Sequence, residues 1–109
     1  MSRVFVTQEQ SKLNYLPAEK YGEIEFITRD EFSPVAKSIG NVDLVESIWS
    51  KLEEFNPEED YVVFSGSPVV AAAVFAAIGR DNDRFTVLRW SNRDNMYTPI
   101  TIDLNPQKG

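Results

Sequence analysis

The sequence predicts a small α/β domain, and the clearest signals lie in the middle of the chain. Residues 61–64 (YVVF) are apolar without interruption, which is typical of an interior strand in a sheet covered by helices. Residues 68–79 form an apolar helical segment, and residues 85–90 (FTVLRW) form the next strand. A strand, a helix and a strand in this order nearly always make a right-handed crossover between parallel strands. We therefore expect a parallel β-α-β unit over residues 61–90, within one α/β domain that spans residues 1–109.

Two shorter strands are predicted before this unit. Residues 3–7 (RVFVT) and 23–28 (EIEFIT) alternate apolar and polar side chains, as in strands with one solvated face. In the second of them, Ile24 and Phe26 are expected to face the core. The polar residues 8–20 between the two strands are expected to form a surface loop.

The first helix is predicted from apolar residues that recur at steps of three and four, which places them on one face. This stripe consists of Val45, Ile48, Trp49, Leu52 and Phe55. Asn41 or Asp43 can cap the start of the helix, and Pro57 ends it. Trp49 belongs to the stripe and is expected to pack in the core.

The second helix is bounded by residues that suit helix ends. Ser67 is a good N-cap, Pro68 suits the first helical position, and Gly79 suits the C-terminal cap. Because this helix is apolar around its circumference, it must lie in the core or under another surface. Burial within the domain and contact with a partner or a second subunit both stay open.

The chain is expected to close with an antiparallel hairpin. Its strands are residues 85–90 and 96–104 (MYTPITIDL), joined by the polar turn 91–95. Pro99 favours the edge of the sheet for the last strand, and residues 105–109 are expected to fray. One face of that strand carries Ile100, Ile102 and Leu104. The complete order is β-β-α-β-α-β-β in a mixed sheet.

Composition excludes several classes of function. The 109 residues include no cysteine and no histidine, so Ser-His-Asp and Cys-His chemistry and cysteine-ligated metals are absent. We predict no catalytic residue, no metal site and no cofactor. Since 17 acidic residues outnumber 11 basic ones, giving a net charge of −6, nucleic acid is not an expected partner. The apolar run 69–78 is about half of the ~20 residues that span a bilayer, so a soluble protein is expected.

The turn between the interior strand and the second helix is the sharpest candidate site. It presents free backbone N–H groups and the positive end of a helix dipole, which suit phosphate, sulfate or carboxylate. In a parallel unit the end of the next strand lies at the same edge of the sheet, so its polar residues are expected nearby. The predicted anion or nucleotide site consists of Ser65, Gly66, Ser67, Arg89, Trp90 and Arg93. The alternative is a helix cap with a tight turn, because the motif lacks both the Walker A lysine and the GxGxxG pattern.

An acidic segment is the second candidate surface. Its five carboxylates are those of Glu53, Glu54, Glu58, Glu59 and Asp60. They could dock a basic partner, and their spacing differs from that of a calcium-binding loop. A solvated helix end and loop explains the same charges without a partner.

Two long segments resemble short uncharacterised accessory proteins of tailed bacteriophages. The resemblance lies in DYVVFSGSPVVAAAVFAAIG and in FTVLRWSNRDNMYTPITIDL, with their Ser-Gly-Ser-Pro turn and Ala-rich helix. It implies a phage protein that acts in the host cytoplasm. We predict a non-enzymatic protein that binds a macromolecule of the host or the phage, and we expect this macromolecule to be a protein. Whether the chain forms a homo-oligomer stays open. The alternatives are an anion- or nucleotide-binding module and a virion or assembly component.

Overall fold

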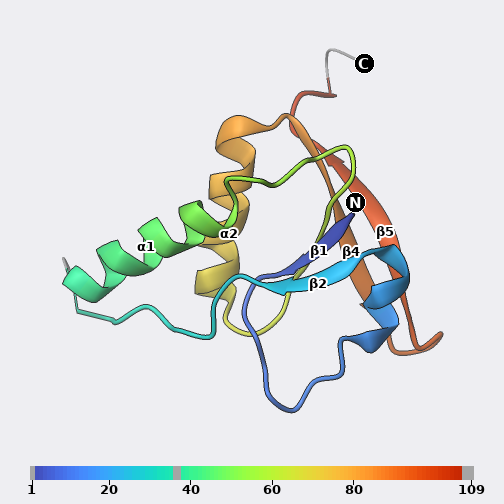
Figure 1. The fold of residues 1–109 in the computed structure, drawn as a ribbon, viewed down its shortest axis with the longest axis horizontal. Helices are drawn as coiled ribbons and strands as arrows, with labels where there is room; N and C mark the ends of the chain where they lie inside the picture. The colour runs from blue at the N-terminus through green and yellow to red at the C-terminus, as the bar shows by residue number, and fades with distance from the viewer. Residues whose placement is uncertain (1, 36–37, 107–109) are drawn as a thin grey trace.

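A computed structural model describes residues 2–35 and 38–106 (Figure 1), and its centre is a five-stranded sheet. The order of strands across the sheet is β2-β1-β3-β4-β5. Their bounds are β1 Arg3–Val6, β2 Glu23–Phe26, β3 Tyr61–Val63, β4 Arg84–Ser91 and β5 Met96–Asp103. The first four strands are parallel, and β5 is antiparallel to β4. The predicted α/β class, order of elements, parallel β3–β4 pair and closing hairpin are therefore confirmed.

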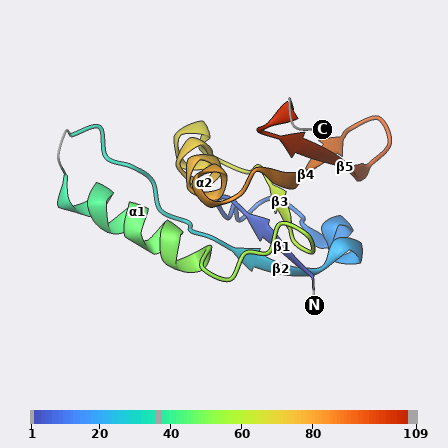
Figure 2. The same ribbon diagram turned by 90° about the horizontal axis from the view of Figure 1, so that it is seen from above.

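Both helices cover the same face of the sheet, as Figure 2 shows. They are α1 (Ile39–Lys51) and α2 (Pro68–Asp81). Between this helical layer and the sheet lies the larger apolar core, which joins Phe5 and Val62 of the strands to Ile48 of α1 and Val74 of α2. This core explains why α2 carries so many small and branched apolar residues.

The opposite face is covered by the connection between β1 and β2 rather than by an α-helix. This connection contains the 3₁₀-helix η1 (Leu16–Tyr21), part of which lies in the predicted surface loop. Tyr15 and Ala18 pack there on Val4, Val63 and Leu88 of the sheet. The predicted interior strand is thus buried at Val62 by the α-helices and at Val63 by this connection.

The first helix differs from its prediction at both ends. It begins at Ile39, after the N-cap residue Ser38, and the Asn41 side chain bonds the main chain of Ser33 instead of capping the helix. It ends at Lys51, well before Pro57. Trp49 is not a core residue: its side chain is 44% exposed, and the Arg80 guanidinium lies 4.6 Å from the centre of its ring.

The second helix begins as predicted but ends later. The Ser67 hydroxyl accepts the N–H groups of Val69 and Val70, which confirms the cap. The helix passes through Gly79 and ends at Asp81, since the Asn82 side chain donates to the Ile78 carbonyl. Its outer face is exposed at Val69, so the helix is not buried all round.

The last strand lies at the sheet edge, as Pro99 predicts. Of the three residues expected to share one face, Ile102 packs against the main core, whereas Ile100 and Leu104 are exposed. Within the predicted frayed tail, residues 107–109 lie outside the described residues. In the described part of the chain no helix is long and apolar enough to cross a bilayer.

Candidate functional site

A groove of about 550 Å³ lies beside the carboxyl end of β3, on the face covered by η1. We call it the β3–β4 groove. The residues that shape it are Leu13, Tyr15, Phe64, Ser65, Trp90 and Tyr97. Its volume lies within the range typical of ligand sites, and most of its lining is apolar with a few convergent polar groups.

The aromatic wall of the groove comes from the β4–β5 hairpin. Trp90 and Tyr97 are cross-strand partners, and their rings meet edge to face with centroids 5.0 Å apart. The Trp90 indole N–H donates to Asn92 Oδ1 at 2.8 Å, which fixes the ring orientation. Trp90 is 38% exposed, and Phe64, the last residue of the predicted interior strand, is 53% exposed. Large apolar side chains are therefore presented to solvent around one hollow.

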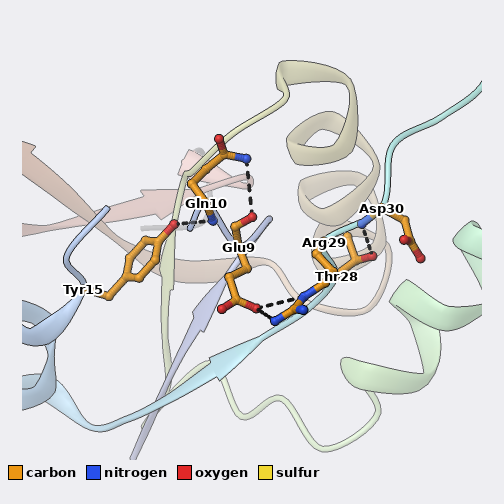
Figure 3. A network of polar contacts seen from close by, with 6 residues as sticks. All are labelled: Glu9, Gln10, Tyr15, Thr28, Arg29 and Asp30. Carbon is orange, nitrogen blue, oxygen red and sulfur yellow. Dashed lines mark hydrogen bonds and ion pairs between the residues drawn. The ribbon is translucent and has the colours of Figure 1, made fainter. Parts of the chain in front are cut away.

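A pair of buried hydroxyls forms the polar end of the groove. Tyr15 Oη and Ser65 Oγ are 2.8 Å apart, and the two residues are 9% and 4% exposed. The Gln10 N–H also donates to Tyr15 Oη, at 2.9 Å (Figure 3). Two hydroxyls carry two protons, and only one of these serves the bond between them. Among the described residues no acceptor takes the second proton, so one donor remains for a group that enters the groove.

Tyr97 is a buried residue of the groove wall. Burial raises the pKa of Tyr97 above its ordinary value, and the neighbouring Tyr15 raises it further. The neutral phenol is therefore the form that the folded protein favours.

The neighbouring crevice, between the ends of β1 and β3, is closed. These two strands lead to opposite faces of the sheet, and in open α/β folds ligands bind at such a switch point. Here Thr7 Oγ1 donates to the Ser65 carbonyl and accepts the Ser65 N–H, both at 2.9 Å. The buried Gln8 side chain adds a second closure, because its Oε1 accepts the Ser67 N–H at 2.7 Å and its amide donates to the Asp30 carbonyl.

The helix N-terminus in the predicted anion site already faces a carboxylate. The Ser67 hydroxyl caps α2 and donates to Glu31 Oε2 at 2.9 Å. Gly66 has a φ of +78°, and a Cβ there would overlap Gln8 Oε1. The turn is thus filled by the chain's own amide and carboxylate groups, an arrangement that disfavours an added anion at Ser67.

An ion pair holds the segments that follow β1 and β2 together (Figure 3). Glu9 Oε1 and the Arg29 guanidinium are 2.6 Å apart, and the hydrogen bond from this carboxylate raises the pKa of Arg29. The Glu9 N–H donates to the Thr28 carbonyl at 2.8 Å. Both contacts anchor the connection that supplies Tyr15 to the groove.

The structure divides the predicted anion site. Ser65, Arg89 and Trp90 line the β3–β4 groove, whereas Gly66 and Ser67 lie outside its lining. Arg93 lies in the exposed hairpin turn beside Asp94 and borders a second hollow, which Arg89 and Trp90 also line. Binding at these residues stays a prediction. Sequence reasoning missed Leu13, Tyr15, Phe64 and Tyr97, and the one available signal was apolar residues within an otherwise polar connection.

The acidic segment is less uniform than its sequence. Asp60 is only 3% exposed, and its carboxylate accepts the N–H groups of Arg3 and Asn56. It therefore organises the chain before β3 and does not reach the surface. Glu54 lies 3.6 Å from the Arg3 guanidinium. The acidic surface that remains consists of Glu53, Glu54, Glu58 and Glu59.

The described residues contain no cluster of three or more acidic side chains that could hold a metal ion. Searches of curated proteins and of solved structures found no match. A family model described as Phage Pam3 gp32-like protein matches residues 2–104. This match covers nearly the whole chain and agrees with the resemblance to phage proteins. The chain belongs to the Phage Pam3 gp32-like protein family and is a phage-associated protein.

Proposed function

We propose that this phage protein works by binding another protein of the phage or its host through the β3–β4 groove. The observation that supports this most is the cluster of exposed apolar side chains around one hollow. Leu13, Phe64 and Trp90 are each more than one-third exposed there. Contiguous apolar surface of this kind marks interaction sites, and aromatic residues dominate the binding energy of many interfaces.

The groove residues are held in place before a partner binds, which favours the binding of an apolar side chain there. Trp90 is fixed by Tyr97 and Asn92, so its ring loses little freedom when a partner covers it. The floor is held by Tyr15, which Gln10 anchors from the β1–β2 connection. A preformed pocket with a rigid aromatic wall needs little rearrangement to accept an apolar side chain.

The alternatives find weaker support. An anion at the Ser67 turn would meet the Glu31 carboxylate 2.9 Å from the Ser67 hydroxyl. The acidic surface can contribute a second contact with a basic partner, which neutralising Glu53, Glu54, Glu58 and Glu59 together would test. Mass spectrometry of purified particles would reveal a virion component.

The two tryptophans provide a matched experiment. Trp90→Ala removes a ring from the groove wall, and Trp49→Ala removes a similarly exposed ring from α1, which covers the other face of the sheet. Each variant and the wild type would be tagged and used to capture proteins from infected and uninfected host lysates. We expect Trp90→Ala to lose a captured protein that Trp49→Ala retains, with an affinity loss of about 30-fold or more.

Far-UV circular dichroism would establish that both variants are folded. Equal capture by Trp90→Ala and the wild type would contradict binding through the groove. If the variant neutralised at the four glutamates loses capture while Trp90→Ala retains it, the acidic surface and not the groove would be the binding site.

A further inference from the structure

The edge of β4 is open where it borders the β3–β4 groove. β3 pairs with β4 only as far as Leu88, opposite Val63. β4 continues through Arg89 and Trp90 to Ser91, and these residues pair with β5 on their other side. Within residues 2–35 and 38–106, these three residues of β4 therefore have no strand neighbour on the side of the groove.

Two contacts of β5 show which way the Trp90 main chain points. The Tyr97 carbonyl accepts the Tyr21 hydroxyl at 3.1 Å, so it points away from β4. Pro99, two residues further, has no N–H to give to its partner Leu88. In an antiparallel pair, hydrogen-bonded and non-hydrogen-bonded pairs alternate. The Leu88–Pro99 and Trp90–Tyr97 pairs are therefore of the non-hydrogen-bonded kind, and Trp90 directs its N–H and C=O away from β5.

The pairing of β3 gives the same result independently. The Val63 carbonyl accepts the Thr7 N–H at 3.0 Å, so Val63 faces β1 and Val62 faces β4. Val62 lies opposite Val87, and the β4 residues that face β3 are then Thr86 and Leu88 on either side of it. Trp90 continues this alternation. Its N–H and C=O point to where β3 would continue, and no hydrogen bond described outside the strand ladders uses them.

We infer that the partner enters the groove as an extended segment that pairs with Trp90 as an added β-strand. This inference rests on the proposed function and specifies its partner. A ligand that covers the groove also covers the Trp90 N–H and C=O, and burying these groups without partners is costly. An extended backbone satisfies both of them at once, whereas a purely apolar ligand satisfies neither. Strand addition to a free sheet edge is a common mode of peptide recognition.

The side-chain walls suit the same occupant. Side chains of a strand alternate between faces, so a strand on this edge sends every second side chain into the groove. There it meets the rings of Phe64 and Trp90 and, at the inner end, the spare hydroxyl proton of the Tyr15–Ser65 pair. A large side chain with a polar acceptor at its tip, such as tyrosine, fits both features.

Hydrogen exchange of the free protein tests the open edge. We expect the Trp90 amide to exchange about tenfold or more faster than the amides of Arg89 and Ser91, which face β5. These two neighbours are an internal control, since they belong to the same strand and the same hairpin. A Trp90 amide as protected as its neighbours would overturn the inference.

A linear heptapeptide library displayed on filamentous phage tests the added strand. Selection on the wild type, with Trp90→Ala for counter-selection, should enrich peptides with a large apolar or tyrosine residue. The tightest peptide would then be synthesised with one N-methylated amide at a time. We expect an affinity loss of about tenfold at the one residue whose N–H pairs with the Trp90 C=O, and little change at the residues on either side of it.

Failure of the strand model can be distinguished from failure of the groove. Peptides that need Trp90 but tolerate N-methylation at every residue would overturn strand addition and leave groove binding intact. Selected peptides that bind Trp90→Ala as well as the wild type would overturn both proposals. If no peptide is enriched while the lysate partner still depends on Trp90, strand addition fails alone.

Discussion

The two crevices at the carboxyl ends of the parallel strands have opposite characters. Between β1 and β3, the side chains of Thr7 and Gln8 bond the main chain of Ser65 and Ser67 and fill the space. Between β3 and β4, the strand end is bordered by rings, and a groove of about 550 Å³ remains. The switch point of the topology is therefore closed in this protein, and the hollow lies one strand further along the sheet.

This difference shows how a few polar side chains decide which crevice of a parallel sheet is open to a ligand. Ser65 takes part in both crevices, because its main chain bonds Thr7 and its hydroxyl bonds Tyr15. Closing the first crevice turns the chain towards β1 after Val63. The same turn leaves Trp90 of β4 without a strand neighbour. The closed crevice thus helps to create the open one.

The largest expected effect comes from breaking the turn at Gly66. Gly66→Ala places a Cβ on Gln8 Oε1 at a φ of +78°, where side chains are strained. We expect the free energy of unfolding to fall by about 2–4 kcal/mol, from the backbone strain and the overpacking together. Urea unfolding followed by circular dichroism would measure the change.

Gly40→Ala is the matched control for this substitution. Gly40 lies in the first turn of α1, and among the described residues a Cβ there meets only the Ser38 hydroxyl, at 3.5 Å. Alanine is a better helix former than glycine, so this variant should be as stable as the wild type or more so by up to about 1 kcal/mol. Equal stability of Gly66→Ala and Gly40→Ala would show that the turn has room for a side chain.

Thr7→Val tests the closure itself with almost no change of volume. The substitution leaves the Ser65 N–H without its acceptor in a site where both residues are buried. We expect a loss of about 1–3 kcal/mol, the usual cost of an unsatisfied buried donor. Thr98→Val on the exposed edge strand should change stability by less than about 0.5 kcal/mol. Equal losses in the two variants would mean that the Thr7–Ser65 bonds do not hold the crevice closed.

The sequence predicted the fold well where a pattern had only one interpretation. The uninterrupted apolar residues of β3, the Ser67-Pro68 helix start and Pro99 at the edge each identify their element by local physics alone. Helix ends were less certain, because the Asn82 side chain extends α2 past Gly79 through a bond to Ile78. Such a contact has no signature in the spacing of residues.

The candidate site was only partly predictable, since its walls come from distant segments. Arg89 and Trp90 could be placed at the sheet edge from the β-α-β pattern. Tyr15 lies 50 residues before Ser65, and no periodicity in the polar connection connects them. The prediction that Asp60 belongs to the acidic surface was wrong for the same reason. A carboxylate in an acidic run is expected to be solvated, and the sequence does not show that the N–H groups of Arg3 and Asn56 bond it.

Tyr15→Phe tests the open β3–β4 groove in the way that Thr7→Val tests the closed crevice. The variant keeps the ring, which meets Phe26 edge to face, and removes only the hydroxyl that joins Gln10 to Ser65. We expect the free energy of unfolding to fall by about 1 kcal/mol, because the Gln10 N–H loses its acceptor. The loss stays small since the site is only partly buried and water can bond this N–H in part. Tyr21→Phe, which removes the bond to the Tyr97 carbonyl, provides a comparison at the other end of η1. A variant as stable as the wild type would show that the hydroxyl pair is kept for binding and not for stability.

The smallest expected effect is the contribution of Tyr97 to the pH dependence of the free energy of unfolding, which measures how well the groove wall excludes water. Burial raises the pKa of Tyr97 in the folded state above the ordinary value of 10.0, so the unfolded chain loses this proton first as the pH rises. Between those two pKa values the folded state binds more protons than the unfolded state, and stability falls with increasing pH. The contribution is complete below pH ~10 and is lost as the pH rises through the folded-state pKa. Urea midpoints measured from pH ~8 to ~11 should therefore decline more steeply for the wild type than for Tyr97→Phe. Parallel curves would mean that water reaches the phenol freely, and the groove would then resemble the solvated surface more than a binding site.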